Sequence, residues 1–104
     1  MMYQVRFSPE AEEQLVALYR YIAEQASPAI AARYTEAIID CCEGLAHFPQ
    51  RGTPRDDLRP GLRLTNYKGR VVIAFAIEGE WVSIIGLFYG GQDFATTLEE
   101  SLDS

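Results

Sequence analysis

Six of the nine basic residues of this 104-residue chain lie between positions 51 and 70, where only two aspartates accompany them. The whole chain is acidic, with a formal net charge of −6, which argues against sequence-independent binding to a phosphate backbone. A local surplus of cations on an acidic protein suits an acidic peptide segment better than a nucleic-acid duplex, and a solvated loop is the alternative. The six basic residues are Arg51, Arg55, Arg59, Arg63, Lys68 and Arg70.

The other residues that could do chemistry are few. Cys41 and Cys42 are adjacent in a helical pattern, so they offer neither a mutual disulfide nor spaced metal ligands. We expect two reduced thiols, at least one of them buried. The single histidine, His47, precedes Phe48-Pro49 at the predicted end of a helix, where it suits a partner of the helix dipole better than a catalyst. We therefore expect no metal and no cofactor.

Two apolar runs organise the rest of the chain. Residues 70–77 and 81–89 are rich in β-branched and aromatic side chains, with Gly79 between them, and this pattern predicts a β-hairpin at the centre of a sheet. A two-residue loop at Gly79-Glu80 fixes the register, whereas a three-residue loop would shift it. The predicted pairs on the strongly apolar side are Ile77 with Val82, Phe75 with Ile84, and Val71 with Phe88.

Side chains alternate between the two faces along a strand, and those predicted for the opposite side of this hairpin are smaller and less apolar. We expect helices on the apolar side and a shallow surface open to a partner on the second side. The residues predicted for the second side are Val72, Ala74, Ala76, Ser83, Ile85 and Leu87, with Tyr89 at its end.

The flanking segments predict the remaining elements. Residues 3–7 and 62–67 alternate apolar and polar side chains as half-buried strands do. Ser8-Pro9 and Ser27-Pro28 each open a helix, since serine accepts hydrogen bonds from the first amides and proline suits the first helical position. Asp93 is expected to cap a last short helix. The order β-α-α-β-β-β predicts an α+β fold, in which a helical hairpin packs on one face of a mainly antiparallel four-stranded sheet.

Short motifs recur in a fixed order through nearly the whole chain, and in this order they resemble the ParE/RelE family of bacterial toxins from type II toxin–antitoxin modules. No single motif is distinctive, but the ordered set is specific. The motifs are Phe7-Ser8-Pro9-Glu10-Ala11, Leu15, Tyr21-Ile22, Phe48-Pro49-Gln50-Arg51-Gly52, Leu62-Arg63, Tyr67 and the final segment Ile84–Asp93.

The family divides by mechanism, and one branch is enzymatic. RelE-like members are metal-free endoribonucleases that cut messenger RNA on the ribosome, which requires cations at the phosphate and an acid–base group near the 2′-hydroxyl. That branch usually has an arginine at the position of Val72 and basic residues at positions 90–92, which here read Gly-Gly-Gln. Under this alternative Tyr89 is the candidate catalytic residue, assisted by Arg63 or Arg70.

ParE-like members share the fold but poison DNA gyrase by binding it, so that cleaved DNA persists. Their last strand typically ends in a His-Gly-Arg-Arg-Asp type sequence, and residues 89–93 here read Tyr-Gly-Gly-Gln-Asp, which keeps the glycine and the aspartate. The missing nuclease arginines favour this branch, a toxin of a plasmid stabilisation module. A third possibility is a homologue that has lost its activity and keeps antitoxin binding.

The resemblance also implies a partner, a cognate antitoxin whose extended C-terminal segment wraps the helices and sheet of the toxin. We expect a single domain over residues 1–104 that works in the cytoplasm, binds neither duplex nucleic acid nor membrane, and contacts the antitoxin or gyrase. The expected partner-binding residues are Arg59, Arg63, Tyr67, Arg70, Tyr89, Gln92 and Asp93.

Overall fold

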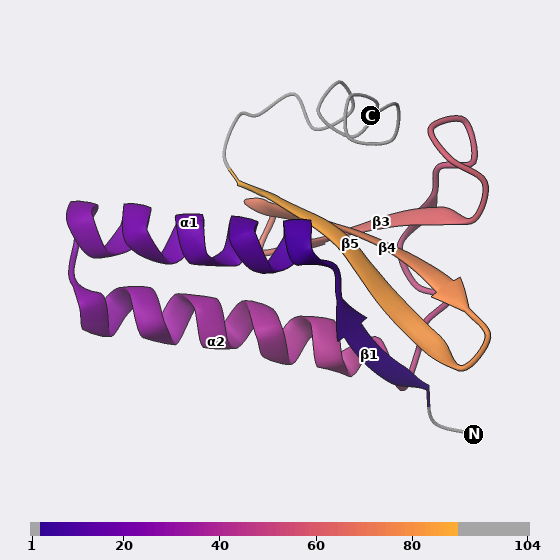
Figure 1. Ribbon diagram of the computed structural model, residues 1–104, viewed down its shortest axis with the longest axis horizontal. Coiled ribbons are helices and arrows are strands. Elements are labelled where there is room, and N and C mark those ends of the chain that lie inside the picture. The colour runs from indigo at the N-terminus through magenta and orange to yellow at the C-terminus, as the bar shows by residue number, and fades with distance from the viewer. Residues whose placement is uncertain (1–2, 90–104) are drawn as a thin grey trace.

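The computed structural model describes residues 3–89 and folds them into two layers, a helical hairpin and a twisted sheet (Figure 1). Both helices cover the same face of the sheet, which leaves the other face to loops and solvent. The predicted last short helix, like Gln92 and its predicted cap Asp93, lies outside the described residues. The elements are β1 (Gln4–Phe7), α1 (Pro9–Gln25), α2 (Pro28–Gly44), β2 (Thr53–Pro54), β3 (Leu62–Tyr67), β4 (Val71–Glu78) and β5 (Trp81–Tyr89).

Among the described residues the sheet has five strands in the order β1-β5-β4-β3-β2, not the four predicted. The three strands β3, β4 and β5 are consecutive antiparallel neighbours and form a meander, which confirms the predicted hairpin at the centre of the sheet. β1 pairs with β5 in parallel, so the sheet is mixed. The fifth strand, β2, has two residues, and its Pro54 pairs with Arg63 at the sheet edge, where a missing N–H is tolerated. A strand this short has no alternation that a sequence could display.

The helical hairpin begins at both predicted caps. The Ser8 hydroxyl oxygen accepts a hydrogen bond from the Ala11 N–H at 3.1 Å, and the Ser27 hydroxyl oxygen accepts one from the Ile30 N–H at 3.2 Å. Each serine is in extended conformation and is followed by proline at the first helical position. The short connection through Ala26 makes the two helices run antiparallel, side by side (Figure 1).

A β-bulge in β5 changes the predicted faces of the hairpin. The two-residue loop Gly79-Glu80 is confirmed, because Glu78 pairs with Trp81. Beyond the loop, Phe75 pairs with Ile84 but Ala74 pairs with Gly86, so Ile85 is an extra residue in β5. The extra residue reverses the alternation after it. The predicted pairing of Val71 with Phe88 is therefore wrong, and Val71 pairs with Tyr89 instead.

Because of the bulge, the side chains after Ile85 lie on the faces of the sheet opposite to those predicted. Leu87 and Tyr89, predicted on the open face, pack with the main cluster under the helices, and Phe88 moves to the open face. The main cluster consists of Ala11, Leu18, Ile38, Cys42, Leu45, Val71, Ile73, Phe75, Val82, Ile84 and Leu87. The open-face cluster consists of Leu62, Ala74 and Phe88, with Leu58, Leu64, Val72 and Ile85 packed against it.

Both cysteines are free thiols, as predicted, and Cys42 is buried in the main cluster. Burial raises the pKa of the Cys42 thiol to about 12, with smaller contributions from Cys41 and Glu43. Cys42 is therefore a protonated core residue rather than a nucleophile at neutral pH.

Candidate partner-binding surface

Four tyrosines from four different elements meet where the end of β5 lies against the helices. The ring of Tyr34 on α2 stands edge-on to that of Tyr67 on β3, with centroids 5.6 Å apart, and edge-on to that of Tyr89 on β5 at 6.3 Å. Tyr21 on α1 completes the group at 6.0 Å from Tyr89. Such edge-to-face contacts add to the free energy of burying the rings. We call these four residues the tyrosine cluster.

The hydroxyl of Tyr34 is the unusual polar atom of the tyrosine cluster. It is buried and has no hydrogen-bond partner among residues 3–89. Burial raises the pKa of Tyr34 above its ordinary 10.0, Tyr89 and Tyr67 raise it further, and the cation of Arg70 partly offsets these effects. The hydroxyl is therefore neutral at physiological pH, and it is a hydrogen-bond donor without an acceptor among the described residues.

An apolar hollow of about 420 Å³ opens beside the tyrosine cluster, between α1 and the end of β5. Tyr21 and Tyr89 form one side of it, and Tyr21 is half exposed. The hollow is large enough to receive one or two apolar side chains of a partner. Its lining residues are Gln14, Ala17, Leu18, Tyr21, Val71, Leu87 and Tyr89.

The walls of this hollow exist because β1 ends before β5 does. β1 pairs with β5 only as far as Ile84. Beyond that residue, two side chains form hydrogen bonds with the backbone of β5 in place of the strand. The Ser8 hydroxyl donates to the carbonyl oxygen of Ile85 at 2.9 Å, and the Leu87 N–H donates to the side-chain oxygen of Gln14 at 2.7 Å. These bonds hold α1 against the bulged part of β5 and fix the position of the neighbouring rings.

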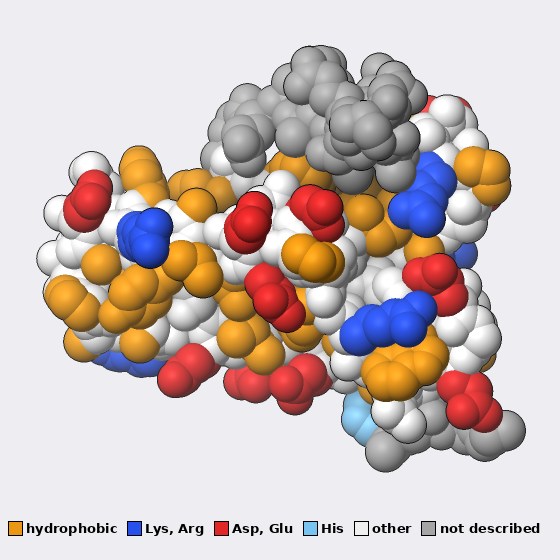
Figure 2. Space-filling model, in the orientation of Figure 1, with side chains coloured by type: hydrophobic (Ala, Val, Ile, Leu, Met, Phe, Trp, Pro, Cys, Tyr) orange, Lys and Arg blue, Asp and Glu red, His pale blue; other side chains and the backbone are white. Residues whose placement is uncertain are grey.

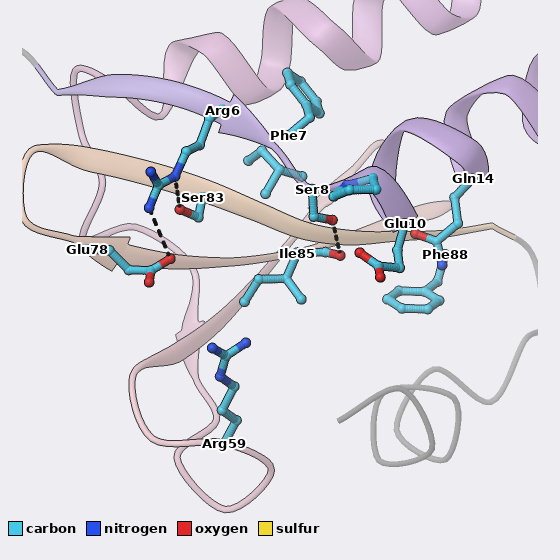
Figure 3. A pocket seen from close by; sticks show the side chains of 12 residues that line it. Arg6, Phe7, Ser8, Glu10, Gln14, Arg59, Glu78, Ser83, Ile85 and Phe88 are labelled. Atoms are coloured by element: carbon cyan, nitrogen blue, oxygen red, sulfur yellow. Dashed lines mark hydrogen bonds and ion pairs between the residues drawn. The ribbon is translucent and has the colours of Figure 1, made fainter. Parts of the chain in front are cut away.

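A second cleft, of about 470 Å³, lies on the open face of the sheet (Figure 3). At one side Arg6 donates to the hydroxyl of Ser83 at 2.8 Å and lies 3.7 Å from the carboxylate of Glu78. Arg59 reaches in from the connection between β2 and β3 toward Ile85, as Figure 3 shows. The cleft therefore combines Arg59, which forms no ion pair with any of residues 3–89, with the apolar side chains of Ile85 and Phe88.

The predicted partner-binding residues do not form one patch. Tyr67 and Tyr89 meet in the tyrosine cluster, and Arg70 is close enough to influence Tyr34. Arg59 faces the second cleft. Arg63 is occupied within the fold, because its guanidinium donates to the backbone carbonyls of residues 50–52, including that of Arg51 at 3.0 Å.

Sequence reasoning missed two members of the tyrosine cluster, Tyr21 and Tyr34. Tyr34 falls in the apolar stripe of α2 and Tyr21 beside that of α1, so each is indistinguishable from an ordinary core-facing position. Their association with Tyr67 and Tyr89 depends on how the hairpin sits on the sheet. No local signal could have found it.

The comparisons with known proteins agree with this architecture. Residues 5–94 match the sequence profile of the ParE toxin of the type II toxin–antitoxin system parDE. The chain belongs to the ParE toxin family. No curated protein matches it. In the part of the chain that the structure describes, no helix is long and apolar enough to cross a membrane, and no three metal-binding side chains come together.

Two solved structures show how widely the ParE family fold extends. A chain of the chromosomal ParDE toxin–antitoxin system from P. aeruginosa is 19% identical, with a TM-score of 0.74 over 85% of this chain and 96% of that one. A chain of the RelBE2 toxin–antitoxin complex from Mycobacterium tuberculosis is 23% identical, with a TM-score of 0.60 over 88% of this chain and 95% of that one. At these identities the likeness shows the fold.

Proposed function

We propose that this ParE-family chain is held inactive by a cognate antitoxin in the cytoplasm and that it acts by binding DNA gyrase rather than by cutting RNA. The observation that carries the proposal is the environment of Val72. This position, where RelE-like nucleases usually have an arginine, is partly buried and packs against the open-face cluster. An apolar position cannot neutralise charge on a phosphate.

The surroundings of the other nuclease candidates support the same proposal. Arg63 already binds three backbone carbonyls of the loop after α2, so its donors are committed to the fold. The ring of Tyr89 packs between those of Tyr21 and Tyr34, as an aromatic anchor of a protein interface does. Protein binding therefore explains these residues more simply than acid–base catalysis does.

The antitoxin is proposed to cover the tyrosine cluster and its apolar hollow. Apolar side chains of the antitoxin would fill the space between Tyr21 and Leu87, and an acidic group would lie near Arg70.

Expression of the chain without antitoxin tests the proposal. We expect growth arrest, induction of the SOS response and intact translated messages, and we expect co-expression of the protein from a neighbouring antitoxin gene to restore growth. Tyr89→Phe keeps the ring and should leave toxicity unchanged. Messages cut in the ribosomal A site, with cutting abolished by Tyr89→Phe, would establish the ribonuclease instead. Harmless expression with tight antitoxin binding would identify an inactive homologue.

A further inference from the structure

The segment from Phe48 to Gly52, which follows α2, exposes an aromatic ring that the fold does not use. Phe48 is 67% exposed, the largest exposed fraction among the large apolar side chains of residues 3–89, whereas Pro49 next to it is buried. Arg51 is also exposed, with its guanidinium 5.9 Å from the centre of the Phe48 ring. A ring left in water contributes little to the stability of the fold, so core packing does not explain Phe48. We call residues 48–52 the Phe48 loop.

The backbone of the Phe48 loop is held firmly against the sheet. The Arg63 guanidinium donates to three of its carbonyls, including that of Arg51 at 3.0 Å. Gly52 has a φ of +84°, and a Cβ there would lie 2.5 Å from the carbonyl oxygen of Leu64, so the end of the loop is pressed onto β3. The N–H of Arg51 also donates to the Phe48 carbonyl at 3.3 Å. The loop is therefore preorganised, and a partner would have to order few groups on binding it.

The charge of the Phe48 loop differs from that of the helical layer. Helix α1 carries four acidic residues and one basic, α2 carries three and one, and Figure 2 shows acidic side chains over both helices. No acidic residue occurs between Glu43 and Asp56. Arg55 is paired with Asp57 at 2.9 Å, whereas Arg51 forms no ion pair with any residue that the structure describes. Charge complementarity therefore favours a carboxylate on the partner that meets this loop.

We propose that Phe48 and Arg51 contact DNA gyrase directly, with the phenyl ring in an apolar pocket of gyrase and the guanidinium at a carboxylate on the rim of that pocket. This inference rests on the proposed action on gyrase and adds the contact residues and the chemistry of the surface that they meet. An aromatic ring and an arginine on a preorganised backbone are typical of the few side chains that dominate the energetics of an interface.

Two other occupants of the Phe48 loop fit the observations less well. Arg63, which holds the loop, and Tyr67 in the tyrosine cluster are four residues apart on β3, about 13 Å along a strand, so the loop lies apart from the proposed antitoxin surface. Binding of single-stranded nucleic acid uses several rings along a basic groove. Phe48 makes no ring contact with another aromatic side chain of residues 3–89. One ring beside one cation suits a pocket in a protein.

Phe48→Ala and Arg51→Glu test the proposal in the reaction of gyrase with supercoiled plasmid. Each substitution should raise the concentration of the chain needed for half-maximal plasmid cleavage about tenfold or more. Phe48→Tyr keeps the ring and Arg51→Lys keeps the charge, so both should lose much less. Because the two side chains are exposed, circular dichroism should show an unchanged fold, and calorimetry should show unchanged binding of the antitoxin from the neighbouring gene.

The matched control is Val16→Ala with Arg20→Glu, which removes an apolar side chain and reverses a charge on α1. Val16 is 49% exposed, and Arg20 lies one turn further along the same exposed face. This variant should promote cleavage as the unaltered chain does.

The same assays separate the inference from the proposed function. If the unaltered chain produces no cleaved plasmid, the proposed function fails and the inference with it. Full cleavage with both Phe48→Ala and Arg51→Glu would overturn the inference and leave the proposed function standing. Weaker antitoxin binding with unchanged cleavage would assign the Phe48 loop to the antitoxin. Binding of single-stranded DNA by the chain alone, or a dimer of the chain in light scattering, would also overturn the inference if Phe48→Ala abolished it while cleavage remained.

Discussion

The backbone N–H of Leu87 donates a hydrogen bond to the side-chain oxygen of Gln14, 2.7 Å away. This bond joins the first helix to the last strand at a point where β1 has already stopped pairing. It lies between the apolar hollow and the cleft on the open face, and Gln14 lines both. The shape of the proposed antitoxin surface therefore depends on a side chain of α1 as much as on the sheet.

Replacing Gln14 with Ala should lower the free energy of unfolding by about 1–2 kcal/mol, because the Leu87 N–H loses its acceptor. Urea unfolding measures the change. Gln25→Ala, at the exposed end of α1, is the control and should stay within about 0.5 kcal/mol of the unaltered chain. Equal stabilities for the two variants would mean that the bond does not hold β5.

Gly86 follows the bulge, and a methyl group there would lie 2.8 Å from the ring of Phe88. Because Phe88 is buried, we expect Gly86→Ala to cost about 1–3 kcal/mol of stability. Gly44→Ala is a matched control, since its methyl group meets nothing within 4 Å and alanine favours the helix. That variant should gain up to about 1 kcal/mol. Thermal unfolding compares them, and a tolerated Gly86→Ala would contradict the described position of Phe88.

Arg63 should contribute to stability, although it was predicted to bind a partner. Arg63→Ala frees the carbonyls of residues 50–52, so the connection after α2 should become more sensitive to limited proteolysis. Arg63→Lys should rescue it poorly, because an ammonium cannot reproduce the fork of the guanidinium. Arg59→Ala, which removes a side chain facing the second cleft, should leave proteolysis unchanged. Identical digestion of all four proteins would argue against this role.

Stability should fall as the pH rises above about 9, and Cys42 is the main reason. Its thiol titrates near 9.0 in the unfolded chain but at about 12 in the folded one, so the unfolded state binds fewer protons between these values. The free energy of unfolding should then decrease by at most about 1.4 kcal/mol per pH unit. Tyr34, whose pKa is also raised, acts in the same direction above 10.0.

Urea unfolding at pH 8 and pH 10 measures this slope, and Cys42→Ala is the comparison. The alanine variant should be less stable at both pH values because of the cavity, yet its stability should decline less with pH. Parallel declines would show that Cys42 is not the group responsible.

Local signals sufficed for much of the fold. The serine caps, the Gly79-Glu80 loop and the strand order of the meander each follow from a few neighbouring residues. The bulge at Ile85 does not follow from such signals, because an extra residue inside a run of apolar side chains does not change the apolar character of the run. The parallel pairing of β1 with β5 and the meeting of Tyr21 with Tyr89 join distant segments, and no periodicity encodes such contacts.

The purified chain mixed with DNA gyrase and supercoiled plasmid provides the most direct measurement of the central claim. We predict that cleaved plasmid accumulates in proportion to the added chain and that prior addition of the antitoxin prevents it. Unaltered supercoiling by gyrase, together with cutting of translated messages by the same preparation, would contradict the account.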